Sequence, residues 1–413
     1  MAGEKLTQYL LTHINTVLKE PRGFIRYPFI DPGAWYDGHV WDWDTFWCVK
    51  ALFSVWDKFP ADLQERILRH AEGNVLNLFD HQLPDGYIPM AVMDTGEGED
   101  TYLNLKHKQG VRMNMCKPFL AQQTALICER KGDWSWAAPL ADGFRRYMQC
   151  YDTYFHADCG LYVWQDDIMI GMDNDPACFG RPPDSTASVL LNGFMVCELE
   201  ALSALYGAWG LAEEAERTKI RRDHLTQAIL RECWDKRDQF FYSVDVDIHT
   251  RTFDWFHQGL GVFWKTLPIK IRSWTGFVPL YAGIATQEQA AALAKHIMDE
   301  KTFLCPGGLC SLARDERMFN LTPSGNPSNW LGAVWLVANY TAFHGLLRYG
   351  YVKEAALIAH RSLSLLEDDL TDTGCLHESY HPFTRKPIMN GGFISWNPLA
   401  LTMQRELAAY TQV

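Results

Sequence analysis

Apolar residues recur at helical spacing along most of the chain, and this periodicity limits the possible folds more than any other feature. An i, i+4, i+8 stripe runs through residues 61–79 and places its apolar side chains on one face of a helix. Similar runs predict further helices at 4–19, 44–57, 117–130, 134–150, 186–207, 211–232, 286–299, 329–349, 352–369 and 391–410. We therefore expect roughly eleven or twelve helices and an all-α protein.

The segments between these helices carry most of the unusual Trp, Asp, Gly and Pro residues. Two segments, one around Cys159-Gly160 and one at 233–247, predict short β-hairpins that each follow a pair of helices. Functional residues are concentrated on loops that a rigid scaffold positions. Paired antiparallel helices with such loops favour a closed α/α toroid, whereas the periodicity alone predicts only a mostly helical chain.

Length and composition indicate one large globular unit. The 413 residues contain no low-complexity linker, so we expect a single domain over residues 1–413. Hydrophobic residues make up 47% and charged residues 21% of the chain, which is enough to bury a large core and is not typical of disorder. Aromatic residues reach 13%, and their flat rings suit the faces of sugars as well as a core.

Charge and cysteine usage exclude several classes of partner. A net charge of −12 argues against nucleic acid and anionic membranes, because no basic stripe could neutralise phosphates. The sequence contains no run of about 18 uninterrupted apolar residues, so we predict no membrane span. The eleven cysteines lack a CxxC pair and the N-terminus is amphipathic with an early Glu4. We therefore expect reduced thiols, no signal peptide, a cytoplasmic location and a small neutral or polar ligand.

Two carboxylates lie where Gly, Pro and aromatic residues make a regular helix unfavourable. Asp173 belongs to GMDNDPACFGRP at 171–182, and Glu378 belongs to HESYHP at 377–382. Acid/base chemistry on a glycosidic bond requires two such groups. Apolar neighbours and nearby aspartates would raise the pKa of Asp173 and keep it protonated as a general acid, with Glu378 as the ionised base. An Asx-turn at Asp173 is an equally good interpretation.

Residues 377–381 also match the zinc motif HExxH. That motif binds zinc only when a helix places both histidines on one face. Gly374 and Pro382 disfavour such a helix, so we expect no metal and no cofactor.

Two segments suit the recognition of hydroxyl groups. Residues 35–47 combine four Trp with Asp37, Asp42 and Asp44, and rings can stack on sugar faces while carboxylates hold hydroxyls. A hydrophobic plug between helices is the alternative. In the second segment, Trp330 follows a polar edge made of Asn326, Ser328 and Asn329.

Arg181 offers a bidentate fork for a substrate carboxylate. A structural ion pair with a nearby aspartate is an equally good interpretation of this residue.

These motifs are similar to those of glycoside hydrolase family 63, and most similar to its mannosylglycerate and glucosylglycerate hydrolases. The matching segments are YPFIDPG and WDWDTFW (27–33, 41–47), DGYIP (85–89), KPFLAQ (117–122), GMDNDP with FGRPP (171–183), PSNWLGAVWLVANY (327–340) and HESYHP with ISWNPLAL (377–401). The resemblance runs in matching order from about residue 23 to 401 and implies an (α/α)6 barrel with an inverting mechanism.

The resemblance also implies roles for particular residues. Asp173 matches the general acid of G-x-D-N-x-P, and Glu378 matches the general base of H-E-x-Y-x-P. The resemblance places Trp41, Trp43 and Asp44 at the subsite of the released sugar. The remaining predicted substrate-binding residues are Tyr36, Tyr87, Gln122, Asn174, Arg181, Trp330 and Trp396.

The chain departs from the family pattern on the side of the leaving group. Leu331 and Ala333 stand where relatives often have Arg or Gln and a Pro, and FTRKP at 383–387 replaces the frequent E-T-G-E-G. Arg385 and Lys386 could serve an anionic aglycone or be solvated loop charges.

We therefore predict an inverting α-glycosidase that hydrolyses a small α-glucoside or α-mannoside, such as glucosylglycerate or mannosylglycerate. An α-glucosidase acting on neutral gluco-oligosaccharides is the alternative within the same chemistry. A sugar epimerase that uses some of the fourteen histidines, or a non-catalytic sugar-binding protein, are the alternatives from other classes.

Overall fold

A computed structural model of the protein describes residues 3–94, 113–248, 265–322 and 328–411. These residues form twelve α-helices, so the prediction of a mostly helical chain is confirmed. The helices are α1 Glu4–His13, α2 Asp42–Ser54, α3 Ala61–Asp80, α5 Leu120–Lys131, α6 Ala141–Tyr154, α7 Val189–Ala208, α8 Ala212–Glu232, α9 Val278–Tyr281, α10 Gln287–Ile297, α11 Leu336–Arg348, α12 Val352–Asp372 and α13 Leu399–Thr411.

The β structure is confined to short antiparallel pairs in the connections. The strands are β1 Leu18–Lys19, β2 Phe29–Ile30, β3 His39–Trp41, β4 Ala91–Met93, β5 Thr186–Ala187, β6 Trp234–Asp235, β7 Phe240–Phe241, β8 Val244–Asp245, β9 Leu267–Pro268, β10 Leu304–Cys305, β11 Gly308–Leu309, β12 Ser379–Tyr380 and β13 Pro387–Met389. They pair as β1–β2, β3–β4, β6–β7, β10–β11 and β12–β13, with β8 between β5 and β9.

Several predicted boundaries shift where tertiary contacts compete with helix formation. The helix expected from residue 329 begins only at Leu336, because Val334 pairs with Tyr380 as a β-bridge and Trp335 is extended. The helix expected from 391 begins at Leu399, and the first helix ends at His13. Around Cys159-Gly160 a single bridge replaces the expected hairpin. Thr286 and Gln289 form a capping box at the start of α10.

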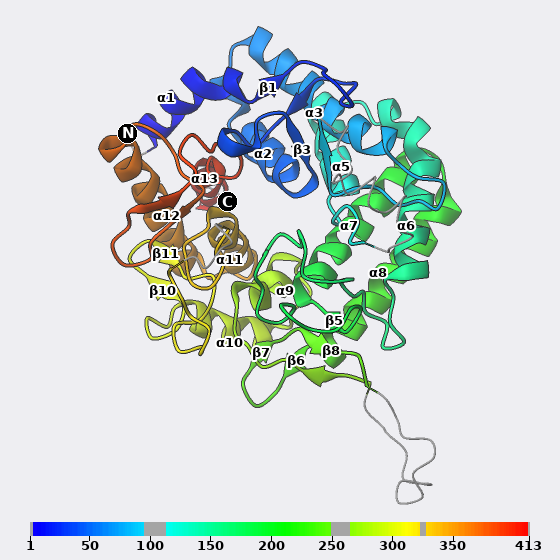
Figure 1. Cartoon of the computed structure of the whole chain (residues 1–413), viewed down its shortest axis with the longest axis vertical. Coiled ribbons are helices and arrows are strands. Elements are labelled where there is room, and N and C mark those ends of the chain that lie inside the picture. The colour runs from blue at the N-terminus through cyan, green and yellow to red at the C-terminus, as the bar shows by residue number, and fades with distance from the viewer. Residues whose placement is uncertain (1–2, 95–112, 249–264, 323–327, 412–413) are drawn as a thin grey trace, which may run out of the picture.

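Six helices contact one another in turn around the centre of the molecule (Figure 1). The contacts run from α2 to α5, α7, α9, α11 and α13, and α13 contacts α2 again. Other helices pack outside them, with α3 on α2, α8 on α7, and α12 on α11 and α13. The pattern of apolar residues explains this layering, because α11 is buried almost all round whereas α12 buries one face.

Helix α7 is long and apolar enough to cross a membrane by length and composition alone. Within the described residues 72% of its most apolar window is buried in the protein, where α7 packs against α5, α8 and α9. A core helix with apolar residues on all faces has this composition.

The eleven cysteines all lie in the described residues and are free thiols. One continuous cluster of buried apolar residues extends from Leu6 to Met403.

Aromatic side chains fill the space between the six central helices. Trp47 on α2 is fully buried, and its ring centroid lies 4.7–6.0 Å from six other rings. These neighbours are Trp43, Phe46, Phe119, Phe194, Tyr281 and Tyr340, which come from or adjoin five of the central helices. The alternative of a hydrophobic plug therefore describes Trp47, while Trp41 and Trp43 have a further role described below.

We expect Trp47→Ala to reduce the free energy of unfolding by about 3–5 kcal/mol, because it leaves a cavity among packed rings. Trp47→Phe should cost less, since the indole N–H of Trp47 has no hydrogen-bond partner to lose. Urea denaturation measures both values. Trp35→Ala is the control, because Trp35 is 64% exposed and its loss should change stability by less than about 0.5 kcal/mol. An equal effect of Trp47→Ala and Trp35→Ala would contradict the central role of Trp47.

Candidate active site

The junction between β3 and α2 carries the first group of predicted site residues. Trp41 ends β3, and Trp43 and Asp44 occupy the first turn of α2. Asp42 fixes this junction, because its carboxylate accepts hydrogen bonds from the backbone N–H of Trp43 at 2.6 Å and of Lys117 at 2.5 Å. The Nζ atom of Lys117 lies 2.8 Å from the same carboxylate. This buried ion pair holds the start of α2 against the segment that precedes α5.

The loop at residues 171–176 brings Asp173 to the same place. Gly171 has φ +94°, and a Cβ atom there would lie 3.2 Å from the ring of Trp43, so the close approach of this loop favours glycine. Asn174 ties the loop to a distant segment. Its side chain accepts a hydrogen bond from the backbone N–H of Trp330 at 2.8 Å and donates one to the Asn329 side chain at 3.1 Å. The Asx-turn belongs to Asp175, whose carboxylate accepts from the Ala177 N–H.

The β12–β13 hairpin positions Glu378. Its backbone N–H donates to the Met389 carbonyl at 3.2 Å, and the residue is 2% exposed. The Tyr36 hydroxyl donates to one carboxylate oxygen at 3.1 Å, and the Asn390 amide donates to the other at 2.7 Å. Two segments, one at Tyr36 and one at 389–390, therefore fix the orientation of this carboxylate.

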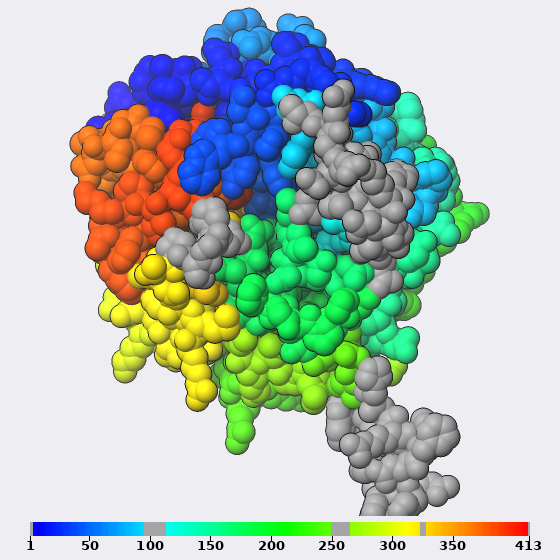
Figure 2. Space-filling view, viewed as in Figure 1, coloured from blue at the N-terminus to red at the C-terminus, as the bar shows by residue number. Residues whose placement is uncertain are grey.

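These segments enclose one cavity of about 240 Å³. The described residues that line it are Tyr36, Trp41, Trp43, Asp44, Lys117, Met169, Gly171, Asp173, Ser328, Trp330, Glu378 and Trp396. Eight of the predicted site residues are among them, including both predicted catalytic carboxylates. Figure 2 shows that blue N-terminal, green middle and orange-red C-terminal segments meet near the centre of this face of the molecule.

Burial dominates the electrostatics of Glu378. It raises the pKa of this carboxyl to about 7, and the charge of Asp173 contributes to the increase. The hydrogen bonds from Asn390 and Tyr36 act in the opposite direction, because they stabilise the ionised form. Burial and the charge of Glu378 raise the pKa of Tyr36, so its hydroxyl remains a donor. When Asp173 is protonated, its contribution disappears and Glu378 ionises more readily.

The other two carboxyls of the cavity have their own surroundings. Burial raises the pKa of Asp173, while a hydrogen bond from Ser328 and the charge of Lys117 lower it. Trp330 donates its indole N–H to Ser328 at 3.1 Å, which orients the serine hydroxyl. Burial also raises the pKa of Asp44 well above its ordinary value, and the charge of Glu378 adds to this effect.

Indole groups supply buried hydrogen-bond donors at this site. Trp41, Trp43 and Trp396 line the cavity, and their buried Nε1–H groups have no acceptor among the described residues. A buried donor without an acceptor costs about 1–3 kcal/mol, so this arrangement favours a ligand rich in oxygen atoms.

Four predicted substrate-binding residues do not line the cavity. Tyr87 is buried elsewhere in the core, and its hydroxyl donates to the Asn114 carbonyl at 3.1 Å. Gln122 donates to the Pro118 carbonyl at 2.6 Å and faces a different cavity. Arg181 forms an ion pair with Asp245 and donates a hydrogen bond to Thr186. Of the two interpretations of Arg181, the structure therefore shows the structural ion pair. Asn174 acts behind the cavity wall by joining the two loops.

The sequence interpretation missed Lys117, Met169 and Gly171 as lining residues and Asn390 as a partner of Glu378. Lys117 and Gly171 lie within motifs that already pointed to a site. Asn390 has φ +59° and precedes two glycines. Its local sequence therefore indicated a turn but gave no indication of a contact with Glu378. Asn326 lies outside the described residues.

The HExxH segment is extended instead of helical, so its histidines do not share a helix face. His377 Nδ1 contacts Asp369 at 2.9 Å, and His381 accepts from the backbone N–H groups of Phe383 and Thr384. Among the described residues no cluster of three or more His, Cys, Asp or Glu side chains could hold a metal ion.

The two cations that we considered for an anionic aglycone are bound to α12. Arg385 pairs with Asp368 at 2.6 Å, and Lys386 pairs with Asp372 at 2.7 Å.

A comparison with family models identifies the chain. The model described as "Mannosylglycerate hydrolase MGH1-like glycoside hydrolase domain" matches residues 39–396. The chain belongs to this MGH1-like family of glycoside hydrolases. The match covers eleven of the twelve described residues that line the cavity, and the exception is Tyr36. The predicted resemblance to glycoside hydrolase family 63 and the prediction of an enzyme are thereby confirmed.

Individual relatives of this MGH1-like chain agree with the family. Mannosylglycerate hydrolase MGH1 of Selaginella moellendorffii is 33% identical over 124 residues, which cover 29% of this chain and 22% of that relative. The chain thus aligns with about a fifth of the length of that protein.

Solved structures show the shared fold. The GH63 mannosylglycerate hydrolase of Thermus thermophilus in complex with glucose has a TM-score of 0.66 and 22% identity, with 95% of this chain and 98% of that chain covered. The same enzyme in complex with Tris and D-glycerate has a TM-score of 0.67 and 22% identity, covering 95% and 99%. These homologues bind small carbohydrate-related ligands.

We expect Tyr36→Phe to move the acidic limb of the kcat/KM profile to higher pH. The substitution removes a hydrogen bond that lowers the pKa of Glu378, so this pKa should rise above about 7. A base must be ionised to act, and activity is therefore lost at a higher pH as the solution is acidified. Tyr87→Phe is the control, because that hydroxyl donates to the Asn114 carbonyl and Tyr87 does not line the cavity. An unchanged limb in Tyr36→Phe would exclude this coupling.

Proposed function

We propose that the protein is an inverting α-glycosidase that hydrolyses a small α-glucoside or α-mannoside, with glucosylglycerate and mannosylglycerate as the leading substrates. The observation that carries the proposal is that Asp173 and Glu378, from loops about 200 residues apart, line one tryptophan-walled cavity. A pair of carboxyls across such a cavity is the machinery of glycoside hydrolysis.

Asp173 is the proposed general acid. Burial raises its pKa, which favours the protonated form that can donate to the leaving-group oxygen. The hydrogen bond from Ser328 orients this carboxyl, and Asn174 holds its loop against Trp330. As the C–O bond breaks, the proton of Asp173 moves to the departing oxygen.

Glu378 is the proposed general base. Two donors, Tyr36 and Asn390, stabilise its ionised form and fix its two oxygens. In this state it can accept a proton from a water molecule that attacks the anomeric carbon from the face opposite the leaving group. The protonation states are compatible, because a neutral Asp173 no longer raises the pKa of Glu378.

The walls of the cavity suit a single sugar ring. The indole groups of Trp41, Trp43 and Trp396 offer apolar surface together with donors, and Asp44 and Lys117 add groups that can bind hydroxyls. A volume of about 240 Å³ lies below the usual range of about 300–1,000 Å³ for drug-sized ligands, which favours a monosaccharide unit over a longer chain in this subsite.

The aglycone is the less constrained part of the proposal. The family match and the relatives named mannosylglycerate hydrolase support glycerate. Among the described lining residues the only cation is Lys117, and Asp42 already neutralises it. This observation favours the second candidate, an α-glucosidase acting on neutral gluco-oligosaccharides.

The epimerase alternative receives no support from the cavity, because none of its described lining residues is a histidine. A non-catalytic sugar-binding protein would not require two carboxyls with raised pKa values in one cavity.

Two further proposals concern the fold and the location. The successive contacts of α2, α5, α7, α9, α11 and α13, with other helices outside them, support an (α/α)6 barrel formed by one domain over residues 1–413. The thiol content supports a cytoplasmic location.

We expect Asp173→Asn and Glu378→Gln each to reduce kcat by at least ~10²-fold, because each removes a proton-transfer group. Activity on mannosylglycerate, glucosylglycerate and α-disaccharides measures the effect, and circular dichroism checks the fold. Asp167→Asn is a matched control, because Asp167 is in the same loop and does not line the cavity. Activity of either variant near that of the wild type would remove that residue from the mechanism.

We expect the first sugar released to be the β-anomer. Attack of water opposite the leaving group inverts the configuration of an α-glycoside. Proton NMR during the first minutes of the reaction detects the anomer before mutarotation mixes the two forms. Initial release of the α-anomer would establish retention and would contradict the role of Glu378 as a base.

A further inference from the structure

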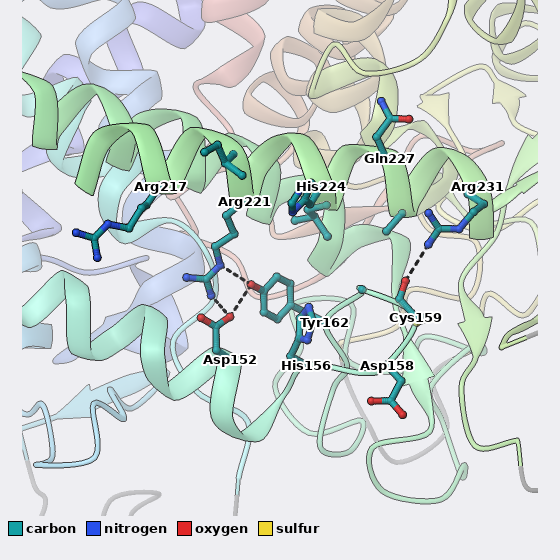
Figure 3. Close-up of a pocket in the computed structure, with 14 residues that line it drawn as sticks. Asp152, His156, Asp158, Cys159, Tyr162, Arg217, Arg221, His224, Gln227 and Arg231 are labelled. Atoms are coloured by element: carbon teal, nitrogen blue, oxygen red, sulfur yellow. Dashed lines mark hydrogen bonds and ion pairs between the residues drawn. The ribbon is translucent and has the colours of Figure 1, made fainter. Parts of the chain in front are cut away.

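A surface groove of about 580 Å³ lies between α8 and the segment 152–162 (Figure 3). Its cationic side chains already have partners. Arg221 is bound by Asp152 and the Tyr162 hydroxyl, and Arg231 donates to the Cys159 carbonyl at 3.0 Å. This groove therefore offers a ligand few unused charges.

A second cavity, about 270 Å³, is lined mainly by residues of α2, α5, α7 and α9, and α2 is the helix that it shares with the active site. It is lined by Phe46, Lys50, Gln122, Ala125, Leu126, Glu129, Trp134, Cys197, Glu200, Ala201, Ala204 and Tyr281. None of these residues lines the first cavity. On α2, Lys50 lies six residues beyond Asp44 and thus about 9 Å further along the helix axis. The aromatic cluster around Trp47 occupies the level between them.

Lys50 is the unusual residue of this second cavity. Its side chain is partly buried, and no carboxylate of the described residues lies within ion-pair distance of its Nζ atom. The Nζ atom of Lys50 lies over the ring of Tyr340, 5.7 Å from the ring centroid. By contrast, the buried Lys117 and the half-buried Lys131 are each paired with a carboxylate, at 2.8 and 2.7 Å.

Two opposing effects act on the Lys50 amine. Burial disfavours the charged form, while the charges of nearby acids favour it. Burial is the larger effect, so the pKa of Lys50 lies below its ordinary value. The ionisable groups around Lys50 are Glu129 on α5, Cys197 on α7, Tyr281 on α9, Tyr340 on α11 and Glu406 on α13. Glu406 is already bound by the Tyr340 hydroxyl at 2.6 Å and by His344 at 2.8 Å.

The charge of the cavity indicates which kind of ligand it can take. Glu129 and Glu200 are exposed residues of its lining and outnumber the single cation. This excess of negative charge disfavours an anion. A neutral compound is preferred, and the apolar wall of Phe46, Leu126 and Tyr281 suits its carbon skeleton.

We propose that Lys50 and its cavity form a second binding site, distinct from the glycosidase site, that captures small neutral carbonyl compounds as a Schiff base. The amine nitrogen attacks the carbonyl carbon and a C–N bond forms. The carbonyl oxygen takes up the two protons that the nitrogen loses and leaves as water. No oxidant or reductant takes part in this step.

The experiment traps the imine on the full-length protein. Purified enzyme is incubated with glycolaldehyde and sodium cyanoborohydride near neutral pH, and the initial rate of alkylation at each lysine is measured by peptide mass spectrometry. We expect Lys50 to react at least ~5-fold faster than Lys131, because the Lys50 amine has no carboxylate partner among the described residues and lies in a cavity, whereas the Lys131 Nζ atom is paired with Glu72 at 2.7 Å. The rate at Lys50 should saturate with glycolaldehyde concentration, whereas the rate at Lys131 should increase linearly.

Two variants make the test independent of folding. Lys50→Arg keeps the positive charge but cannot form the imine, so it should abolish only the fast-reacting site and leave hydrolysis unchanged. Lys131→Arg should leave the fast site intact. A rate at Lys50 no greater than at Lys131, or a rate that does not saturate, would overturn the proposal whatever the glycosidase assays show.

Discussion

The packing of aromatic rings around Trp47 is the interaction on which the rest of the structure depends. Rings from α2, α7, α9 and α11 and from the residue before α5 meet there in edge-to-face and tilted arrangements. Each such pair stabilises the fold beyond the burial of its surface. These rings lie between the level of Asp44, which lines the active-site cavity, and the level of Lys50, which lines the second cavity. Side chains six residues apart on α2 therefore face different chemistry.

The active-site cavity is assembled from loops that this core holds at one level. The Asp42–Lys117 ion pair joins α2 to the segment before α5, and Asn174 joins the acid loop to Trp330. Breaking a buried ion pair of this kind by removing one partner is strongly destabilising. The connections thus fix the cavity wall at the same positions where they supply the proposed catalytic groups, which explains how motifs dispersed over more than 300 residues line one cavity.

Burial raises the pKa of both proposed catalytic carboxyls, and their hydrogen-bond partners differ. Glu378 receives strong donors at both oxygens from Tyr36 and Asn390. Asp173 accepts a hydrogen bond from Ser328, whose hydroxyl oxygen in turn accepts one from the indole N–H of Trp330. A carboxyl with more donors ionises more readily in the same low-dielectric environment. The proposed assignment of acid and base rests on the sequence motifs, and the two donors at Glu378 support it by stabilising the ionised form of that carboxyl.

The periodicity of apolar residues determined the helical class, and local turn residues determined most helix positions, including the capping box at Thr286. The periodicity failed where long-range contacts compete, as at Val334, whose bridge to Tyr380 delays the start of α11. The motifs and the family resemblance together pointed to both carboxyls and the tryptophan wall, whereas the residue types alone also allowed an Asx-turn at Asp173 and a hydrophobic plug. Only the tertiary structure decided that Arg181 pairs with Asp245, that Gln122 faces the second cavity, and that Asn390 supports Glu378. Spacing along a chain specifies which side chains share a helix face, but it carries no information on which distant segment will lie opposite them.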